Sequence, residues 1–390
     1  MNGPNRIIYR VAVILILLIA QVGSSEIFAA DISSADLPLL YDGCTSRVPV
    51  AGFDKRLYFI LDTGSTVSAF DNVYVSYLGN PIGQGIASTM ARAKTVFTLY
   101  HCPSILVGSF PSAIERVASI DLSTVQRVSG SECDGILGPD FAAQHVLSID
   151  LDRSIVHVSA SPSTAVTHHS ISVPMTRVVG DHFGIRALVN GVPLCLMIDT
   201  GDNGSISLNE HDWEQVFSHT SKDEIHTALA ASISGVPIRM SAARVETLRV
   251  GQDTDFGAIA TLAVNRTAPS TLGLRFLRRY IATLDLKRQM LYLHPSSLFH
   301  EKENADMSGL HLIRSKSQTI VYGVDESSPA EGAGLRPGDV IEFVNGHEAD
   351  ELSLREIRRA LKSYDGAVVS LSVKREDQTS EITFNLKAVL

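Results

Sequence analysis

This sequence has few cysteines and few aromatic residues, and it has no excess of positive charge. Only four cysteines occur in 390 residues, which excludes a small scaffold held together by many disulfides. Aromatic residues make up 6% of the chain, yet hydrophobic residues reach 45%, enough to build sizeable packed cores. Asp and Glu (42) outnumber Lys and Arg (33). This balance argues against nucleic acid or an anionic membrane surface as the main partner.

Apolar runs long enough to cross a bilayer are also lacking after the N-terminal region. Arg6 and Arg10 precede an apolar run over residues 11–20, and small residues follow it. This arrangement predicts a signal peptide over residues 1–30, with an uncleaved N-terminal anchor as the alternative. We therefore expect an exported protein, periplasmic or secreted, with no integral membrane span once the signal is removed.

The four cysteines are open to several pairings in an exported protein. Cys44, Cys102 and Cys133 lie in the first half of the mature chain, so there is room for one bridge among them. Cys195 lies within the apolar run 194–198, which predicts a buried, unpaired thiol.

One internal repeat organises the chain. An apolar, strand-like run ends in Asp-Thr-Gly at residues 62–64, and another ends in Asp-Thr-Gly at residues 199–201, 137 positions later. An Ile-Leu-Gly step at 136–138 matches a Thr-Leu-Gly step at 271–273, 135 positions later. A β-hairpin pattern follows each step. Such self-similarity predicts two copies of one β-rich unit.

The repeat divides the mature chain into three folded parts. We expect a first lobe over residues 35–160 and a second over residues 170–296. Residues 159–172, rich in Ser, Thr, Pro and His, are typical of an exposed connection. Residues 295–308 form a second, polar and charged junction, and residues 306–390 form a separate small module.

A short helix is predicted after each Asp-Thr-Gly. Asp71 is a good N-cap for a helical segment that runs through Leu78. In the second copy, Ser207 with Glu210 predicts a capping box for a helix around Trp213.

The C-terminal module resembles a PDZ domain. The residues that carry the resemblance are 328–330, 333–335, 337–341 and 344–346. They predict a strand over 340–344 followed by an Asn-Gly turn. A helical stripe from Leu354 to Leu361 and strands over 368–373 and 382–386 complete the pattern.

The PDZ resemblance implies binding of an extended peptide or a protein C-terminus. In the family the ligand adds a strand to a sheet edge, and backbone N–H groups hold its carboxylate. The residues that correspond to the peptide-binding loop are Gly309, Leu310, His311 and Leu312. His311 stands where the family has Gly, which weakens the expectation of carboxylate binding. The alternative is a module that only packs against the rest of the chain.

Residues 40–295 resemble the retropepsin-like aspartic peptidases, in particular the bacterial members with two lobes fused in one chain. Residues 62–65 match the catalytic loop, and residues 134–138 match the hydrophobic-Gly element that packs behind it. The resemblance implies a mainly β fold of two tandem retropepsin-like acid-protease β-barrel lobes. These would form a pseudo-twofold cleft, and the small α+β PDZ domain would follow them.

The same resemblance implies particular roles for residues of both loops. Asp62 and Asp199 correspond to the catalytic pair. The supporting residues of the loops are Thr63, Gly64, Ser65, Thr200, Gly201 and Asp202. Each threonine is expected to brace the opposite loop, and a flap is expected near residues 81–86 in the first lobe and 231–236 in the second.

Two carboxyl groups suit amide hydrolysis without a metal or a covalent intermediate. One activates water as a general base while the other acts as a general acid. Carboxyls held about 3 Å apart do not both ionise readily, so they share one proton. We therefore expect an aspartic endopeptidase that acts on a polypeptide and uses no cofactor. We expect no metal site either, since His168 and His169 lack partners at ligand spacing. The alternative is a catalytically inactive peptide-binding or scaffold protein with the same folds.

The second loop departs from the first at Asp202, which stands where Ser65 does. A third acid beside the pair would raise its proton affinity by charge repulsion. Alternatively, Asp202 points away and caps residues 203–205 locally, which we favour because such turns are common in Gly-rich stretches. Residues 269–271 (Pro-Ser-Thr) also replace the Asp-Gly-Ile of residues 134–136.

Overall fold

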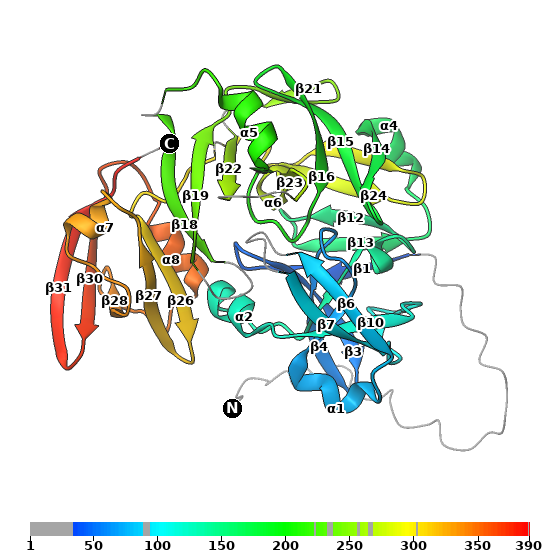
Figure 1. Ribbon diagram of the computed structural model, residues 1–390, viewed down its shortest axis with the longest axis horizontal. Coiled ribbons are helices and arrows are strands. Elements are labelled where there is room, and N and C mark those ends of the chain that lie inside the picture. The colour runs from blue at the N-terminus through cyan, green and yellow to red at the C-terminus, as the bar shows by residue number, and fades with distance from the viewer. Residues whose placement is uncertain are drawn as a thin grey trace, which may run out of the picture. The chain divides into compact units, whose positions relative to one another are not determined.

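A computed structural model describes most of the chain beyond the N-terminal region (Figure 1). The described residues are 34–88, 94–221, 224–231, 237–255, 258–263, 268–301, 303–388 and 390. The predicted signal peptide lies outside them, as do residues 232–236 of the second predicted flap. The fold is mainly β, as predicted, with three hydrogen-bonded sheets among the described residues. In these same ranges, no helix has the length and apolar character needed to span a membrane.

The first repeat is a β-unit with three short α-helices and one 3-10 turn. Its strands are β1 (Ser34–Pro38), β2 (Leu40–Tyr41), β3 (Ser46–Gly52), β4 (Lys55–Leu61), β5 (Ala69–Asp71), β6 (Gly83–Ser88), β7 (Lys94–His101), β8 (Leu106–Val107), β9 (Phe110–Pro111), β10 (Arg116–Ile120), β11 (Gly135–Leu137), β12 (Val146–Asp150) and β13 (Ile155–Ser159). Its helical segments are η1 (Asn72–Tyr74), α1 (Val75–Leu78), α2 (Ser123–Ser129) and α3 (Pro139–Ala142). Strand β11 lies between β4, which is parallel to it, and β5, which is antiparallel. Strand β10 is parallel to β5 and antiparallel to β7.

The second repeat pairs its strands in the same way. Its strands are β14 (Ile171–Val179), β15 (His182–Val189), β16 (Val192–Ile198), β17 (Ile206–Leu208), β18 (His226–Ala231), β19 (Pro237–Arg244), β20 (Leu248–Val250), β21 (Asp253–Asp255), β22 (Ile259–Ala263), β23 (Thr271–Leu272), β24 (Tyr280–Asp285) and β25 (Met290–Pro295). Its helices, with the one that precedes it, are α4 (Thr164–His169), α5 (Glu210–Phe217) and α6 (Leu274–Leu277). Strand β23 is parallel to β16 and antiparallel to β17, while β22 is parallel to β17 and antiparallel to β19. The sequence repeat is therefore also a repeat of strand pairing.

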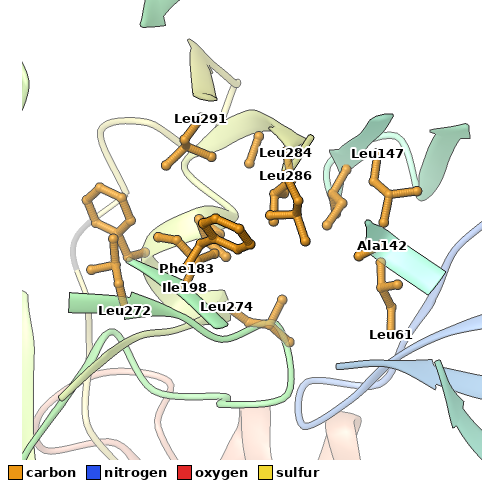
Figure 2. Close-up of a cluster of buried hydrophobic side chains, with 14 of the residues drawn as sticks. Leu61, Ala142, Leu147, Phe183, Ile198, Leu272, Leu274, Leu284, Leu286 and Leu291 are labelled. Atoms are coloured by element: carbon orange, nitrogen blue, oxygen red, sulfur yellow. The ribbon is translucent and has the colours of Figure 1, made fainter. Parts of the chain in front are cut away.

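The predicted hairpins of the two repeats are confirmed, and they pair with each other. They form one antiparallel sheet in the order β1-β13-β12-β24-β25-β14 (Figure 1). Leu147 lies opposite Leu284 across the repeats, and the Ser148 and Thr283 hydroxyls are 2.7 Å apart. Figure 2 shows side chains from both repeats, Leu147 and Leu284 included, that belong to one buried cluster. The two repeats therefore share a core.

Two local predictions meet different outcomes. Asp71 caps the first helical segment as predicted, accepting a hydrogen bond from the Val73 N–H at 3.1 Å. The capping box at Ser207 is wrong, because Ser207 lies in β17 and Asn209 is the N-cap of α5. The Asn209 side chain accepts from the Asp212 N–H at 2.9 Å.

The connection between the repeats is more ordered than its composition suggests. It contains α4, whose N-cap Ser163 accepts a hydrogen bond from the Val166 N–H. Strand β14 already begins at Ile171. The Ser163 cap satisfies one of the N–H groups that the start of a helix leaves without a partner.

The cysteine predictions need correction in two respects. All four thiols are free, so no bridge joins Cys44, Cys102 or Cys133. The Cys133 thiol instead donates to the Gly135 carbonyl, and burial raises the pKa of both Cys102 and Cys133 to about 12. Cys195 is exposed rather than buried, because the alternation of β16 turns it outward between two buried leucines.

The C-terminal module has its own sheet and core. Its elements are β26 (Leu310–Ser315), β27 (Gln318–Val324), β28 (Val340–Val344), β29 (His347–Glu348), β30 (Val368–Arg375), β31 (Gln378–Asn385), α7 (Pro329–Gly332) and α8 (Leu354–Ala360). The strand order is β26-β27-β28-β30-β31, and all pairs are antiparallel. The predicted strand over 340–344 is confirmed. So is its Asn-Gly turn, in which Asn345 and Gly346 both have positive φ (51° and 82°).

Replacement of Leu284 by Ala tests the shared core between the repeats. Leu284 is fully buried opposite Leu147. We expect Leu284→Ala to lower the free energy of unfolding by about 2–5 kcal/mol, because a cavity replaces packed atoms. Urea denaturation measures the change. Val179→Ala is the control, since Val179 is 51% exposed, and an equal loss in both variants would contradict the shared core.

Candidate active site

Both Asp-Thr-Gly loops leave a strand end in the same way. Strand β4 ends one residue before Asp62, and β16 ends one residue before Asp199. The Asp62 N–H donates to the Leu137 carbonyl at 2.9 Å, and the Asp199 N–H donates to the Leu272 carbonyl at 3.1 Å. Each aspartate is thereby fixed to the β11 or β23 segment behind it. A side chain that starts from a paired strand end is held more rigidly than one on a free loop.

The two threonines lock the loops together. The Thr63 hydroxyl donates to the Ile198 carbonyl at 2.8 Å and accepts from the Thr200 N–H at 3.1 Å. In return, the Thr200 hydroxyl donates to the Leu61 carbonyl at 2.8 Å and accepts from the Thr63 N–H at 3.0 Å. Both threonines are buried. The two loops therefore meet within one chain. The hydrogen-bonding groups of each threonine find their partners in the other loop and in the strand end that precedes it.

Each of the two carboxyl groups lies next to the glycine of the opposite loop. The Asp62 side chain is hydrogen-bonded to the Asp199 side chain. Asp62 Oδ1 accepts from the Gly64 N–H, and Asp199 Oδ1 accepts from the Gly201 N–H, both at 2.9 Å. A methyl group on Gly64 would stand 2.3 Å from Asp199 Cγ, and one on Gly201 would stand 2.4 Å from Asp62 Cγ. Only glycine leaves room for the opposite carboxyl.

The protonation of the pair follows from its surroundings. Burial raises the pKa of Asp62, while hydrogen bonds from Gly64, Asp199 and Ser65 and the nearby His182 pull that pKa down. Two carboxyls in hydrogen-bond contact repel each other when both are charged, which favours a single proton shared between them.

His182 also joins the two repeats at the site. It lies at the start of β15, and its Nε2 is 2.8 Å from the Ser65 carbonyl oxygen. Its Nδ1 is 3.0 Å from the Val179 carbonyl oxygen. Sequence reasoning missed this residue, because a single histidine before an apolar strand carries no motif.

Ser65 and Asp202 occupy matching positions but make different contacts. The Ser65 hydroxyl donates to the Asp62 main-chain carbonyl at 2.9 Å rather than to its carboxyl. The Asp202 carboxylate accepts from the Gly204 N–H at 2.8 Å and from the Ser207 and Thr271 hydroxyls at 2.6 Å. The local capping that we favoured for Asp202 is thus what the structure shows.

The elements behind the two loops are also built differently. In the first repeat, a methyl group on Gly135 would stand 2.4 Å from the Ala69 carbonyl oxygen, so β11 fits closely against β5. In the second repeat, Ser270 takes the matching position. Its hydroxyl donates to Asp212 at 2.5 Å and accepts from the Asn209 N–H at 3.0 Å. At this position, Ser270 therefore makes hydrogen bonds where Gly135 allows close packing.

A hairpin stands in each repeat where a flap was expected. The predicted flap at 81–86 falls on β6, which pairs with β7. The prediction at 231–236 falls mostly outside the described residues, but it adjoins the β18–β19 hairpin. A cavity of about 840 Å³ extends from Gly201–Gly204 of the second loop to that hairpin. Its lining includes Val125 and Val128 of α2 and Met240 of β19.

In the predicted peptide-binding loop of the C-terminal module, backbone N–H groups donate hydrogen bonds to side chains of the same chain. Gly309 has positive φ (76°), and its N–H donates to Asp306 at 2.7 Å. The Leu310 N–H donates to the Ser308 hydroxyl at 3.0 Å. His311 Nε2 is 2.8 Å from Asp325 Oδ1. Donors that a terminal carboxylate would need are therefore already engaged by the chain's own Asp306 and Ser308.

Helix α8 is also in contact with β26 and with the first repeat. Arg358 of α8 donates to the carbonyls of Leu312 at 2.9 Å and of Val128 at 2.6 Å. A methyl group on Gly130 would stand 3.0 Å from Leu354. Residues 128–130 thus lie against α8.

Among the described residues, no side chains are arranged as a candidate metal site. In the part of the chain that the structure describes, no cluster of three or more His, Cys, Asp or Glu side chains could hold a metal ion.

Comparisons with known proteins match the C-terminal module. Residues 320–375 match the family model of the PDZ domain, so the predicted PDZ domain is confirmed. The zinc metalloprotease RasP of Shouchella clausii (strain KSM-K16) is 40% identical over 73 residues, 19% of this chain and 16% of the relative. A probable CtpA-like serine protease of Staphylococcus haemolyticus (strain JCSC1435) is 29% identical over 86 residues, 22% of this chain and 17% of the relative. The chain thus matches less than a fifth of the length of these curated relatives.

One solved structure resembles part of the chain. A retropepsin-like aspartic protease from Rickettsia conorii is similar over 32% of this chain and 87% of its own, with 20% sequence identity and a TM-score of 0.25. At this level the similarity carries no weight for activity. We therefore interpret the loops from their own contacts.

Removal of one threonine hydroxyl tests the lock between the loops. We expect Thr63→Val to lower the free energy of unfolding by about 1–3 kcal/mol, because the buried Thr200 N–H loses its acceptor. Thermal unfolding measures the loss. Thr63→Ser keeps the hydroxyl and should retain most of the stability. If Thr63→Ser were as damaging as Thr63→Val, the hydrogen bonds would not be the cause.

Proposed function

We propose that this chain is an aspartic-type endopeptidase in which Asp62 and Asp199 activate water between them. One observation carries the proposal: the reciprocal threonine lock holds two carboxyl groups in hydrogen-bond contact over a pair of glycines. In this proposal the two repeats are tandem retropepsin-like lobes related by a pseudo-twofold axis, and the substrate lies in the cleft between them.

The reaction follows from the shared proton. The ionised carboxylate removes a proton from a water molecule, whose oxygen attacks the peptide carbonyl carbon. The protonated carboxyl gives its proton to the carbonyl oxygen, which forms a neutral tetrahedral intermediate. When the C–N bond breaks, the amine nitrogen takes up the proton of the protonated carboxyl and leaves, while one hydroxyl of the intermediate gives its proton to the other carboxylate and becomes the carbonyl oxygen of the new acid. The two carboxyls then again hold one proton between them.

Substrate and location form part of the same proposal. The cavity beside the second loop has apolar lining residues, among them Val125, Val128 and Met240, which suits an extended polypeptide with apolar side chains. The PDZ domain would recruit a protein through an extended peptide. Export to the periplasm or the medium would follow from the N-terminal signal.

Loss of one carboxyl is the direct test of the dyad. We expect Asp62→Asn to lower cleavage of an unfolded protein by about 10²–10⁴-fold, because general acid/base exchange is lost. Proteolysis assays in acid measure it. Asp181→Asn is the control, since Asp181 is exposed and pairs only with Arg177 in the contacts described here. A wild-type protein that cleaves nothing yet still binds peptides would support the scaffold alternative instead.

The pH dependence has a definite sign. Since burial raises the pKa of Asp62, the shared proton persists in acid and is lost as the pH rises through the upper pKa of the pair. We expect kcat/KM to fall on that side, because the general acid disappears. It should also fall at low pH, where both carboxyls are protonated. A kcat/KM that keeps rising above neutral pH would contradict the shared-proton mechanism.

A further inference from the structure

The first loop has an acidic support that the sequence of the second repeat lacks. Ser68, just before β5, donates its hydroxyl to Asp140 at 2.5 Å and its N–H to the same carboxylate at 3.1 Å. The Ser68 hydroxyl also accepts from the Gly138 N–H at 2.9 Å. Ser205 lies 137 positions after Ser68, but Arg275 stands 135 positions after Asp140. The second repeat thus keeps the serine and has a cation in place of the acid.

A carboxylate from outside the repeat occupies this place. The Ser205 hydroxyl donates to Glu303 Oε2 at 2.5 Å, the distance at which Ser68 meets Asp140. Oε2 also accepts from the Ile259 N–H at 2.9 Å. Oε1 pairs with Arg275 at 3.2 Å. Glu303 belongs to the junction between β25 and β26, a segment predicted to be polar and charged, and it is only 9% exposed.

The contacts of Glu303 are linked to the second Asp-Thr-Gly loop through Ser205 and residues 273–275. The Gly273 N–H donates to the Ser205 carbonyl at 2.9 Å, and the Leu274 N–H donates to the Asp202 carbonyl at 2.7 Å. The loop after Asp199 is therefore tied to residues 273–275, the segment that ends in the Arg275 paired with Glu303. A buried serine hydroxyl, a backbone N–H and a guanidinium all depend on this one carboxylate.

We infer that Glu303 is a positioning residue for the second loop, supplied by the junction in place of the acid that Asp140 provides in the first repeat. The inference rests on the proposed function for its effect on catalysis, but its effect on loop order is independent of it. The second loop is complete only when the junction to the PDZ domain is seated. Displacement of that junction would loosen the loop that carries Asp199.

The test compares Glu303→Gln with Glu301→Gln in the full-length chain. Glu301 belongs to the same junction and pairs with Arg278, so its variant removes a junction charge without touching the loop. We expect Glu303→Gln to lower kcat about tenfold with little change in KM, and to speed amide hydrogen exchange in residues 199–206 several-fold. Glu301→Gln should leave both quantities unchanged.

The matching positions of the two repeats suggest a variant that should rescue Glu303→Gln. Arg275→Asp places a carboxylate where Asp140 stands in the first repeat. Alone, it should be harmful, because it faces Glu303 with like charge. In the Glu303→Gln background it should restore slow exchange in residues 199–206 and recover most of kcat. If Glu303→Gln does not fold, Glu303→Asp, which withdraws the carboxylate by one methylene, takes its place in the same comparison.

The outcomes separate the two proposals. If Glu303→Gln and Glu301→Gln exchange alike over residues 199–206, or if Arg275→Asp rescues nothing, the positioning role is wrong whatever the activity. If the wild-type chain cleaves no protein while Glu303→Gln alone loosens the loop, the proposed catalysis fails and the positioning role stands.

Discussion

Four hydrogen bonds from two buried threonines are the constraint on which the candidate site depends. Each hydroxyl donates to the strand end of the opposite repeat and accepts from the opposite loop. Neither threonine can be satisfied by its own repeat in this geometry. The lock therefore sets the separation of Asp62 and Asp199, and the two glycines beneath them follow from the close approach that it imposes. The burial that raises the pKa of Asp62 accompanies that approach.

The symmetry of the lock does not extend to what supports it. The first loop depends on an acid from its own repeat, while the second depends on Asp202 for a local cap and on Glu303 from the junction. Duplicated units can drift in this way because only the geometry of the reacting groups must stay matched. The carboxylate that accepts the hydrogen bond of Ser68 or Ser205 can come from any segment that lies close enough to that serine.

Much of this architecture was predictable from patterns in the sequence. The repeat offset, the hairpins and the Asn-Gly turn at Asn345 depend on local periodicity and turn chemistry, which survive without tertiary context. Cys195 was misjudged because an apolar run does not reveal which face of a strand is covered. His182 and Glu303 carry no motif, since each has a key contact with a residue more than 90 positions away, Ser65 for His182 and Ser205 for Glu303. Thus the pair of aspartates and the bracing threonines could be proposed from the sequence, but His182 and Glu303 could not.

The sheet shared by the hairpins has a consequence for synthesis of the chain. Strand β12 gains its partner β24 only through residues more than 130 positions later. Until the second repeat leaves the ribosome, β12 presents an open edge with unpaired backbone groups, and such an edge can pair with a second nascent copy. In a truncated chain that ends after the first repeat, the edge of β12 would stay unpaired permanently. Association through β12 would then give a two-chain version of the same sheet, with one Asp-Thr-Gly loop from each chain.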